Sequence, residues 1–227
     1  MFQIVLSQRL TADFTDNPFN YYRKLRVENP SSYMYFMEFD NFHVIGSSPE
    51  RLVAVHGNKV STNPIAGTRK RGQNEFEDQA LIEDLESDPK EVAEHKMLVD
   101  LGRNDIGKIS KYGSIEVPVF MKVEKYRYVM HITSEVTGEL LPEFTAMDAL
   151  RATLPAGTLS GAPKHRAYQR IYEFETQKRG NLWWSYRLSN EKWKLRFCNC
   201  HSDNGLERQE STCSSRSRNC LRFSTRT

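Results

Sequence analysis

The chain has 227 residues, of which 38% are hydrophobic and 27% charged, and its formal net charge is +3. This length is typical of one domain of ordinary size. No stretch reaches the roughly 20 apolar residues of a transmembrane helix, and the N-terminus lacks the basic and apolar regions of a signal peptide, so we expect a soluble cytoplasmic protein without a membrane partner.

The first third of the chain is predicted to contain one helix and several strands. The strands are expected at residues 2–7, 32–39, 42–47, 52–55 and 59–62. Because the chain begins inside the first strand, we expect that it lacks the start of a longer domain. Asn17-Pro18 opens the helix, since proline suits the first turn, and Asn29-Pro30 ends it. Gly57-Asn58 predicts a tight hairpin between the last two strands.

The middle of the chain is predicted to be helical first and then rich in strands. Residues 75–104 have helical apolar spacing, and Asp88-Pro89 divides them into two helices, because a residue before proline avoids helical geometry. Residues 114–141 show the alternation of strands. Two further helices are expected at 145–154 and 163–177. Antiparallel groups of strands with helices inserted between them predict an α+β fold for residues 1–180.

The composition changes after Gly180. All four Cys and all three Trp lie in residues 181–227, which contain no Ala, Val, Ile, Met or Pro. This segment carries nine Lys/Arg and four Asp/Glu, so the positive charge of the chain belongs to it. A charge confined to one unusual segment is poor support for a nucleic-acid partner, and we expect none. A Ser/Arg-rich tail that contacts RNA is the alternative interpretation.

Five motifs follow one another in residues 1–180. They are SPER at 48–51, PIAGT at 64–68, AEH at 93–95 running into LVDLGRND at 98–105, MHI at 130–132, and LPAGTLSGAPK at 154–164. Together they resemble the catalytic domain of the chorismate-utilising enzymes, most closely the anthranilate synthase component I branch. The resemblance implies a partial form of that fold, with antiparallel sheets and flanking helices, in residues 1–180.

The resemblance also implies an activity. Enzymes of this branch are lyases that convert chorismate and ammonia to anthranilate and pyruvate, the first step of tryptophan biosynthesis, with magnesium as cofactor. Residues 1–180 contain no Cys nucleophile, so glutamine hydrolysis is assigned to a partner, the amidotransferase subunit called component II. Ala66 stands where aminodeoxychorismate synthases commonly carry a nucleophilic Lys, which favours anthranilate synthesis over that alternative.

By the same resemblance, His131 and Glu50 are the catalytic candidates and Glu94 is a magnesium ligand. An imidazole titrates near neutral pH and can transfer a proton, which suits a catalytic role for His131. The alternative is that His131 is a structural residue packed between sheets. Glu50 is either a general acid or a cap in a Ser-Pro-Glu turn. Glu86 and Glu91 are interpreted as solvated helix residues. The second carboxylate ligand is implied to lie near the C-terminus of such enzymes, in a part that this chain lacks.

The remaining candidates are binding residues. Gly67, Thr68, Gly157 and Thr158 fit donors aimed at substrate carboxylates. Lys164 either adds a positive charge for those carboxylates or faces solvent. Residues Ser32, Tyr33 and Met34 match half of a tryptophan feedback site, and a plain amphipathic strand is the alternative.

Residues 181–227 are predicted to be an out-of-frame, disordered tail. If each tail codon is read from its second base, the adjacent Trp183 and Trp184 yield paired glycines, because every tryptophan codon is TGG. With suitable synonymous codons the shifted frame restores Ala, Val and Ile and resembles the C-terminal part of the same family. We therefore expect a chain that is unstable alone and inactive, or a non-catalytic remnant of a disrupted gene.

Overall fold

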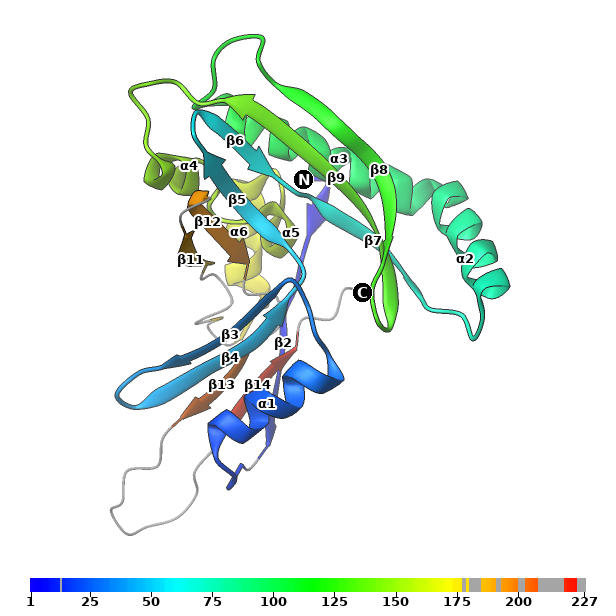
Figure 1. The fold of residues 1–227 in the computed structure, drawn as a ribbon, viewed down its shortest axis with the longest axis vertical. Coiled ribbons are helices and arrows are strands. Elements are labelled where there is room, and N and C mark those ends of the chain that lie inside the picture. The colour runs from blue at the N-terminus through cyan, green and yellow to red at the C-terminus, as the bar shows by residue number, and fades with distance from the viewer. Residues whose placement is uncertain are drawn as a thin grey trace.

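The computed structural model of the protein describes residues 1–12, 14–176, 179, 185–190, 193–199, 203–207 and 219–223. In these residues helices and antiparallel sheets are mixed along the chain, which confirms the predicted α+β class. Figure 1 shows a larger sheet at the top and a smaller sheet with α1 below it. No helix in the described part of the chain is long and apolar enough to cross a membrane.

The larger sheet has seven strands and carries two of the predicted motifs, PIAGT on β7 and MHI on β9. Its order is β11-β12-β5-β6-β9-β7, and β8 also pairs with β9. The strands are β5 (Arg51–His56), β6 (Lys59–Thr62), β7 (Ile65–Lys70), β8 (Glu116–Lys125), β9 (Val129–Glu139), β11 (Ser185–Asn190) and β12 (Trp193–Asn199). The β5–β6 hairpin turns at Gly57-Asn58, as predicted.

The smaller sheet has the order β2-β14-β13-β4-β3. Its strands are β2 (Gln8–Ala12), β3 (Tyr33–Glu38), β4 (Phe42–Ser48), β13 (Asp203–Glu207) and β14 (Asn219–Phe223). A separate two-stranded pairing joins β1 (Gln3–Ile4) to β10 (Gly161–Ala162). The predicted strand at 2–7 is thus shorter than expected, because it pairs along only two residues.

The first four described helices begin directly after a residue whose side chain caps them. They are α1 (Pro18–Glu28), α2 (Glu75–Ser87), α3 (Pro89–Gly107), α4 (Ala146–Thr153), α5 (Gly157–Ser160) and α6 (Lys164–Phe174). Asp88 separates α2 from α3 in an extended conformation, and its side chain accepts hydrogen bonds from the backbone of Lys90 and Glu91. Thr145 and Asp148 form a reciprocal capping box at the start of α4.

Helix α3 packs against β6, β7 and β9 of the larger sheet. The core between these layers and α4 consists of aliphatic side chains, and its members are Leu52, Val53, Val55, Val60, Val99, Ile106, Ile109, Val136, Leu140, Ala149, Ala156 and Leu159. A polar contact fixes the same interface: the Nε2 atom of the fully buried His95 lies 2.7 Å from Ser134 Oγ, which accepts a hydrogen bond from Met121 N. The motif helix is therefore held in one register on the sheet.

The structure describes only four stretches of the C-terminal segment, and the predicted disorder of residues 181–227 stays a prediction. In its described residues β12 pairs with β5 of the larger sheet, and β13 pairs with β4 of the smaller one. Strand pairing uses main-chain groups, which every residue type other than proline supplies in full, and this segment contains no proline. Strands β4 and β5 can therefore pair with segments whose side chains are not typical of a hydrophobic core.

A partly buried ion pair between Arg71 and Asp78 holds α2 to the end of β7 and predicts an acid-sensitive step. The Arg71 guanidinium donates to both carboxylate oxygens of Asp78, and together with the backbone N–H of Gly72 it lowers the pKa of Asp78 to about 2. A depressed carboxyl pKa stabilises the folded state above its unfolded value of 3.8, and this contribution disappears as the pH falls through about 2.

We therefore expect the urea midpoint to fall between pH 3.8 and about 2. In Asp78→Asn this step is expected to be much smaller, and the midpoint at neutral pH is expected to be lower. Asp100→Asn is the matched control, because Asp100 pairs with Arg103 on an exposed face of α3. Equal pH profiles for the parent chain and Asp78→Asn would contradict the assignment.

Candidate active site

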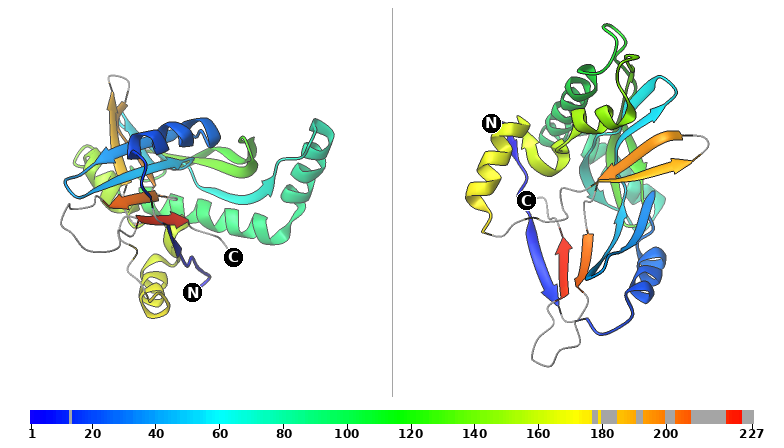
Figure 2. Two further views of the ribbon diagram at one scale, coloured as in Figure 1. Left: turned by 90° about the horizontal axis from the view of Figure 1, so that it is seen from below. Right: turned by 90° about the vertical axis from the view of Figure 1, so that its left-hand side faces the viewer.

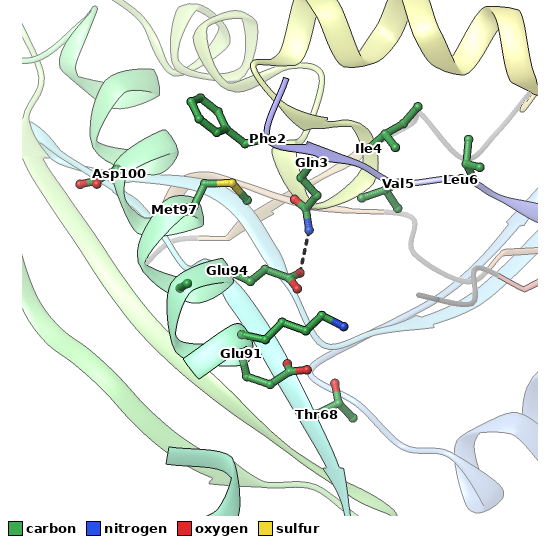
Figure 3. Close-up of a pocket in the computed structure, with 12 residues that line it drawn as sticks. Phe2, Gln3, Ile4, Val5, Leu6, Thr68, Glu91, Glu94, Met97 and Asp100 are labelled. Carbon is green, nitrogen blue, oxygen red and sulfur yellow. Dashed lines mark hydrogen bonds between the residues drawn. The ribbon is translucent and has the colours of Figure 1, made fainter. Parts of the chain in front are cut away.

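A cavity of about 970 Å³ lies between the N-terminal segment and α3 (Figure 3). Its walls come from three parts of the chain, namely residues 2–6, residues 90–100 of α3, and Thr68 on β7. Figure 3 shows the side chains of Glu91 and Glu94 projecting from successive turns of α3 towards the opposite wall. Segments far apart in the sequence thus enclose one acidic cavity.

Glu94, the predicted metal ligand, points across this cavity. Its Oε1 accepts a hydrogen bond of 2.8 Å from Gln3 Nε2, which comes from β1 on the facing wall (Figure 3). Glu91 also lines the cavity, and a Cβ atom at Gly67 would lie 3.3 Å from its Oε2. The interpretation of Glu91 as a solvated helix residue therefore needs correction: helix spacing puts it on the face of Glu94, towards the motif at Gly67.

Gly67, Thr68 and His131 come together where β7 pairs with β9. His131 Nδ1 lies 3.0 Å from Thr68 Oγ1 and 3.1 Å from Gly67 O. The register shifts between Ala66 and Thr68, and Gly67 takes a φ of +76°, which favours glycine. A carbonyl oxygen can only accept, so the contact with Gly67 favours the tautomer with a proton on Nδ1, which leaves Nε2 to take up or deliver a proton.

Tyr126 lies next to the same histidine, with the two rings edge to face at 5.5 Å. Burial and the nearby Glu124 raise the pKa of Tyr126 to about 12, and the charge of Glu50 contributes to the shift. The phenol therefore stays protonated at neutral pH. The same contribution means that the charge of Glu50, the second catalytic candidate, acts on Tyr126.

Glu50, Gly157 and Thr158 line a second, much smaller cavity of about 30 Å³. Glu50 is only 5% exposed, and its Oε2 accepts a hydrogen bond of 3.1 Å from Thr158 Oγ1. Gly157 passes so close to Leu101 that a Cβ atom would lie 2.2 Å from its Cδ2. The two motifs thus meet each other, and a larger residue at Gly157 would require the Leu101 side chain to move.

Lys164 lies behind this turn and is part of an ion pair. Its Nζ donates to Asp105 Oδ2 at 2.5 Å and to Thr153 O at 2.6 Å, and its side chain is 13% exposed. Of the two alternatives for Lys164, solvent exposure is thus excluded, and its ammonium is directed at Asp105. Burial lowers the pKa of Lys164 and raises that of Asp105, while each charge opposes the shift of the other.

The residues predicted to bind tryptophan lie on the smaller sheet. Tyr33 is buried and pairs with Ser48, while Met34 is half-buried and pairs with Ser47. Ser32 is exposed just before the strand begins. They do not line the large cavity, and their role in binding tryptophan stays a prediction.

The large cavity offers oxygen ligands of the type that magnesium prefers. Glu91 and Glu94 supply carboxylates on one face of α3, and magnesium usually binds proteins through one or two carboxylates while it keeps several waters. Within the described ranges no three His, Cys, Asp or Glu residues gather into a metal cluster. The donor set thus fits a magnesium ion that takes its other ligands from water and a bound substrate.

Gln3, Glu91 and Asp105 are the site residues that the sequence did not identify. Gln3 lies far from every quoted motif, and Asp105 was noted only as the last residue of one. The i, i+3 spacing of Glu91 and Glu94 was the one available signal, because such residues share a helix face.

The pattern of motifs has a counterpart among known protein families. Residues 1–182 match the family described as chorismate binding enzyme. The chain belongs to this chorismate binding enzyme family. The match covers the motifs that line both cavities, and it confirms the resemblance found in the sequence.

Two curated relatives of this chain share the name anthranilate synthase component 1. Anthranilate synthase component 1 from Lactococcus lactis subsp. lactis (strain IL1403) is 98% identical over 180 residues, which are 79% of this chain and 40% of that protein. The protein of the same name from Acetivibrio thermocellus is 58% identical over 180 residues, 79% of this chain and 36% of its own length.

The fold also matches a solved structure in this family. The crystal structure of anthranilate synthase component I from Streptococcus pneumoniae TIGR4 superposes with a TM-score of 0.85 at 52% identity, covering 98% of this chain and 47% of that one. The chain thus spans less than half the length of each of these relatives.

Proposed function

We propose that residues 1–180 carry one share of the active site of an anthranilate synthase component I. The observation that carries the proposal is the single cavity that Glu91 and Glu94 share with Thr68, beside His131. Carboxylates suited to a cation and a histidine suited to proton transfer meet there. The names of the relatives support chorismate as substrate and anthranilate as product.

In this proposal the protein residues bind and orient the substrate. Glu94 and Glu91 would hold magnesium, which when bound supplies positive charge to a substrate carboxylate. His131 moves the proton that accompanies loss of the substrate hydroxyl, with its ring fixed by Gly67 O. Glu50 is the second proton carrier, held by Thr158. Lys164 does not contact the substrate in this proposal, and it supports the turn at Gly157 through its ion pair with Asp105.

Ala66 and the relatives favour ammonia as the attacking group. Ala66 is fully buried on β7 beside Gly67, and a methyl group cannot act as the nucleophile that a lysine there would supply in aminodeoxychorismate synthesis. A component 1 implies a component 2, and we propose that this is the amidotransferase that delivers ammonia from glutamine. Feedback by tryptophan would act through Ser32, Tyr33 and Met34.

We further propose that this chain alone does not turn over chorismate. It spans 40% of the Lactococcus lactis relative, and the residues after Gly180 are proposed to come from a shifted reading frame. The family match ends at residue 182, next to the change in composition. Sequencing the DNA around the Gly180 codon tests this proposal. It would be refuted if neither alternative reading frame after Gly180 encoded a sequence similar to the C-terminal part of the family.

The function is tested by grafting residues 1–180 into the Lactococcus lactis relative in place of its matched segment. The graft is expected to form anthranilate from chorismate, ammonia and magnesium at a rate close to that of the parent, as followed by anthranilate fluorescence. In the Glu94→Gln graft the magnesium concentration that gives half the maximal rate should rise by more than about 10- to 100-fold. A loss of about that size follows when only a residue that hydrogen-bonds to a metal ligand is removed, and removing a ligand itself should cost more.

Two controls complete this test. Glu86→Gln removes an exposed carboxylate from α2 and should leave the magnesium requirement unchanged. The 227-residue chain under the same conditions should give no anthranilate. A graft that binds chorismate without forming anthranilate, or a Glu94→Gln graft with an unchanged magnesium requirement, would overturn the proposed site.

A further inference from the structure

Arg179 is a buried arginine that no motif includes. Its side chain is 2% exposed. The guanidinium donates to both oxygens of Glu175, at 2.8 and 2.5 Å, to Leu159 O at 2.6 Å, and to Val5 O at 2.5 Å. One planar group thus joins the segment after α6, the α5 turn and the N-terminal segment.

Glu175 extends this contact to a second point of the N-terminal segment. Its Oε1 accepts hydrogen bonds from Ser7 N at 2.7 Å and from Ser7 Oγ at 3.0 Å. Burial opposes ionisation of Glu175, but the hydrogen bonds from Arg179 and Ser7 outweigh it and lower the pKa of the carboxyl group. The carboxylate is therefore charged at neutral pH, and charge-assisted hydrogen bonds are the stronger kind.

The contacts of this Arg179–Glu175 clasp lie on two parts of the candidate site. Val5 belongs to the wall formed by residues 2–6, from which Gln3 reaches Glu94. Leu159 follows Thr158, which holds Glu50. Figure 2 shows the N-terminal strand running beside the α5–α6 region.

Apart from the Arg179–Glu175 clasp, few backbone hydrogen bonds hold the wall formed by residues 2–6. Its backbone bonds to the facing segment are Phe2 N to Ala162 O of β10 at 2.9 Å and Val5 N to Ser160 O at the end of α5 at 3.1 Å, and β1 pairs with β10 along two residues. A two-residue ladder is too short to be stable by itself. The wall therefore depends on groups outside the ladder.

We propose that Arg179 is a positioning residue that, with Glu175, fixes the N-terminal wall of the cavity against the α5 turn. The clasp keeps Gln3 on Glu94 and sets the width of the cavity without touching what binds there. The inference rests on the proposed function only in taking this cavity as the substrate site.

The test is amide hydrogen exchange in the full 227-residue chain. In Arg179→Met the amides of Val5, Ser7 and Leu159 are expected to exchange about tenfold faster or more, because charge-assisted hydrogen bonds are lost. The amides of Ile132 and Val136 in the buried β9 should keep their rates. The Arg179→Lys variant should restore part of the protection, since it keeps the charge but loses the fork.

Arg170→Met is the matched control, because it breaks an exposed Arg–Glu pair three residues apart on α6 and should leave the wall unchanged. If Arg179→Met does not fold, Ser7→Ala and Glu175→Gln decide the question, with faster exchange at Val5 expected in both. Equal loss of protection at Val5 and Ile132 in a folded variant, or unchanged exchange at residues 2–7, would overturn the inference. A graft without anthranilate activity leaves this result standing, so the two proposals fail separately.

Discussion

In the graft, His131→Ala is expected to lower the rate of anthranilate formation by about 10²–10⁴-fold, which is the usual contribution of a positioned proton-transfer group. The reason is geometric: Gly67 O and Thr68 Oγ1 fix Nδ1 of His131 at the edge of the β7–β9 pairing. The loss should appear mainly in kcat, because the imidazole acts in the reacting step rather than in binding. The measurement is the initial rate at saturating chorismate and magnesium.

His165→Ala is the control for this variant, because His165 is exposed on α6. It should leave the rate unchanged. Thr68→Val should give an intermediate loss, since it removes one of the two contacts at Nδ1 and leaves the imidazole in place. A folded His131→Ala graft with near-parent kcat would show that the histidine is a packing residue of the strand, which is the alternative that the sequence left open.

Lys164→Met in the graft is expected to lower the free energy of unfolding at pH 7 by about 3–5 kcal/mol, because it leaves the buried Asp105 carboxylate without its close cation. Urea unfolding followed by far-UV circular dichroism measures the change. A loss of this size is a large part of the about 5–15 kcal/mol that holds a typical domain folded.

The loss in Lys164→Met should depend on pH. Burial already raises the pKa of Asp105, and removing Lys164 takes away the interaction that opposes this shift. An acid with a raised folded pKa favours the folded state most below its unfolded pKa, and that advantage disappears as the pH rises through the folded value. The destabilisation should therefore shrink as the pH is lowered from about 7 towards about 4.

Lys108→Met is the control for the same carboxylate. Lys108 Nζ lies 3.5 Å from Asp105 Oδ1, but its side chain is 54% exposed, so the loss should stay below about 1 kcal/mol. Combining Lys164→Met with Asp105→Leu should cost less than Lys164→Met alone, because no buried charge then remains. A Lys164→Met loss no larger than that of Lys108→Met would contradict the buried pair.

Most of the secondary structure between residues 17 and 174 was predictable from local signals. The starts of α1 and α3 follow from Asn17-Pro18 and Asp88-Pro89, and the β5–β6 hairpin from Gly57-Asn58. Each signal works through one or two peptide units, so it needs no information about the rest of the chain. The short α5 was missed, because its four residues have no capping side chain and no apolar period.

The sequence by itself determined most elements of residues 17–174, although not β7, α5 or β10, and it determined the fold class and, through five ordered motifs, the family. Only the tertiary structure decided that Gln3 meets Glu94, that Glu91 faces Gly67, that Lys164 binds Asp105, and that described strands of the tail pair with β4 and β5. The physical reason is range. Caps and turns are fixed by neighbouring residues, whereas an ion pair or a strand edge joins residues that come together only after the layers have packed.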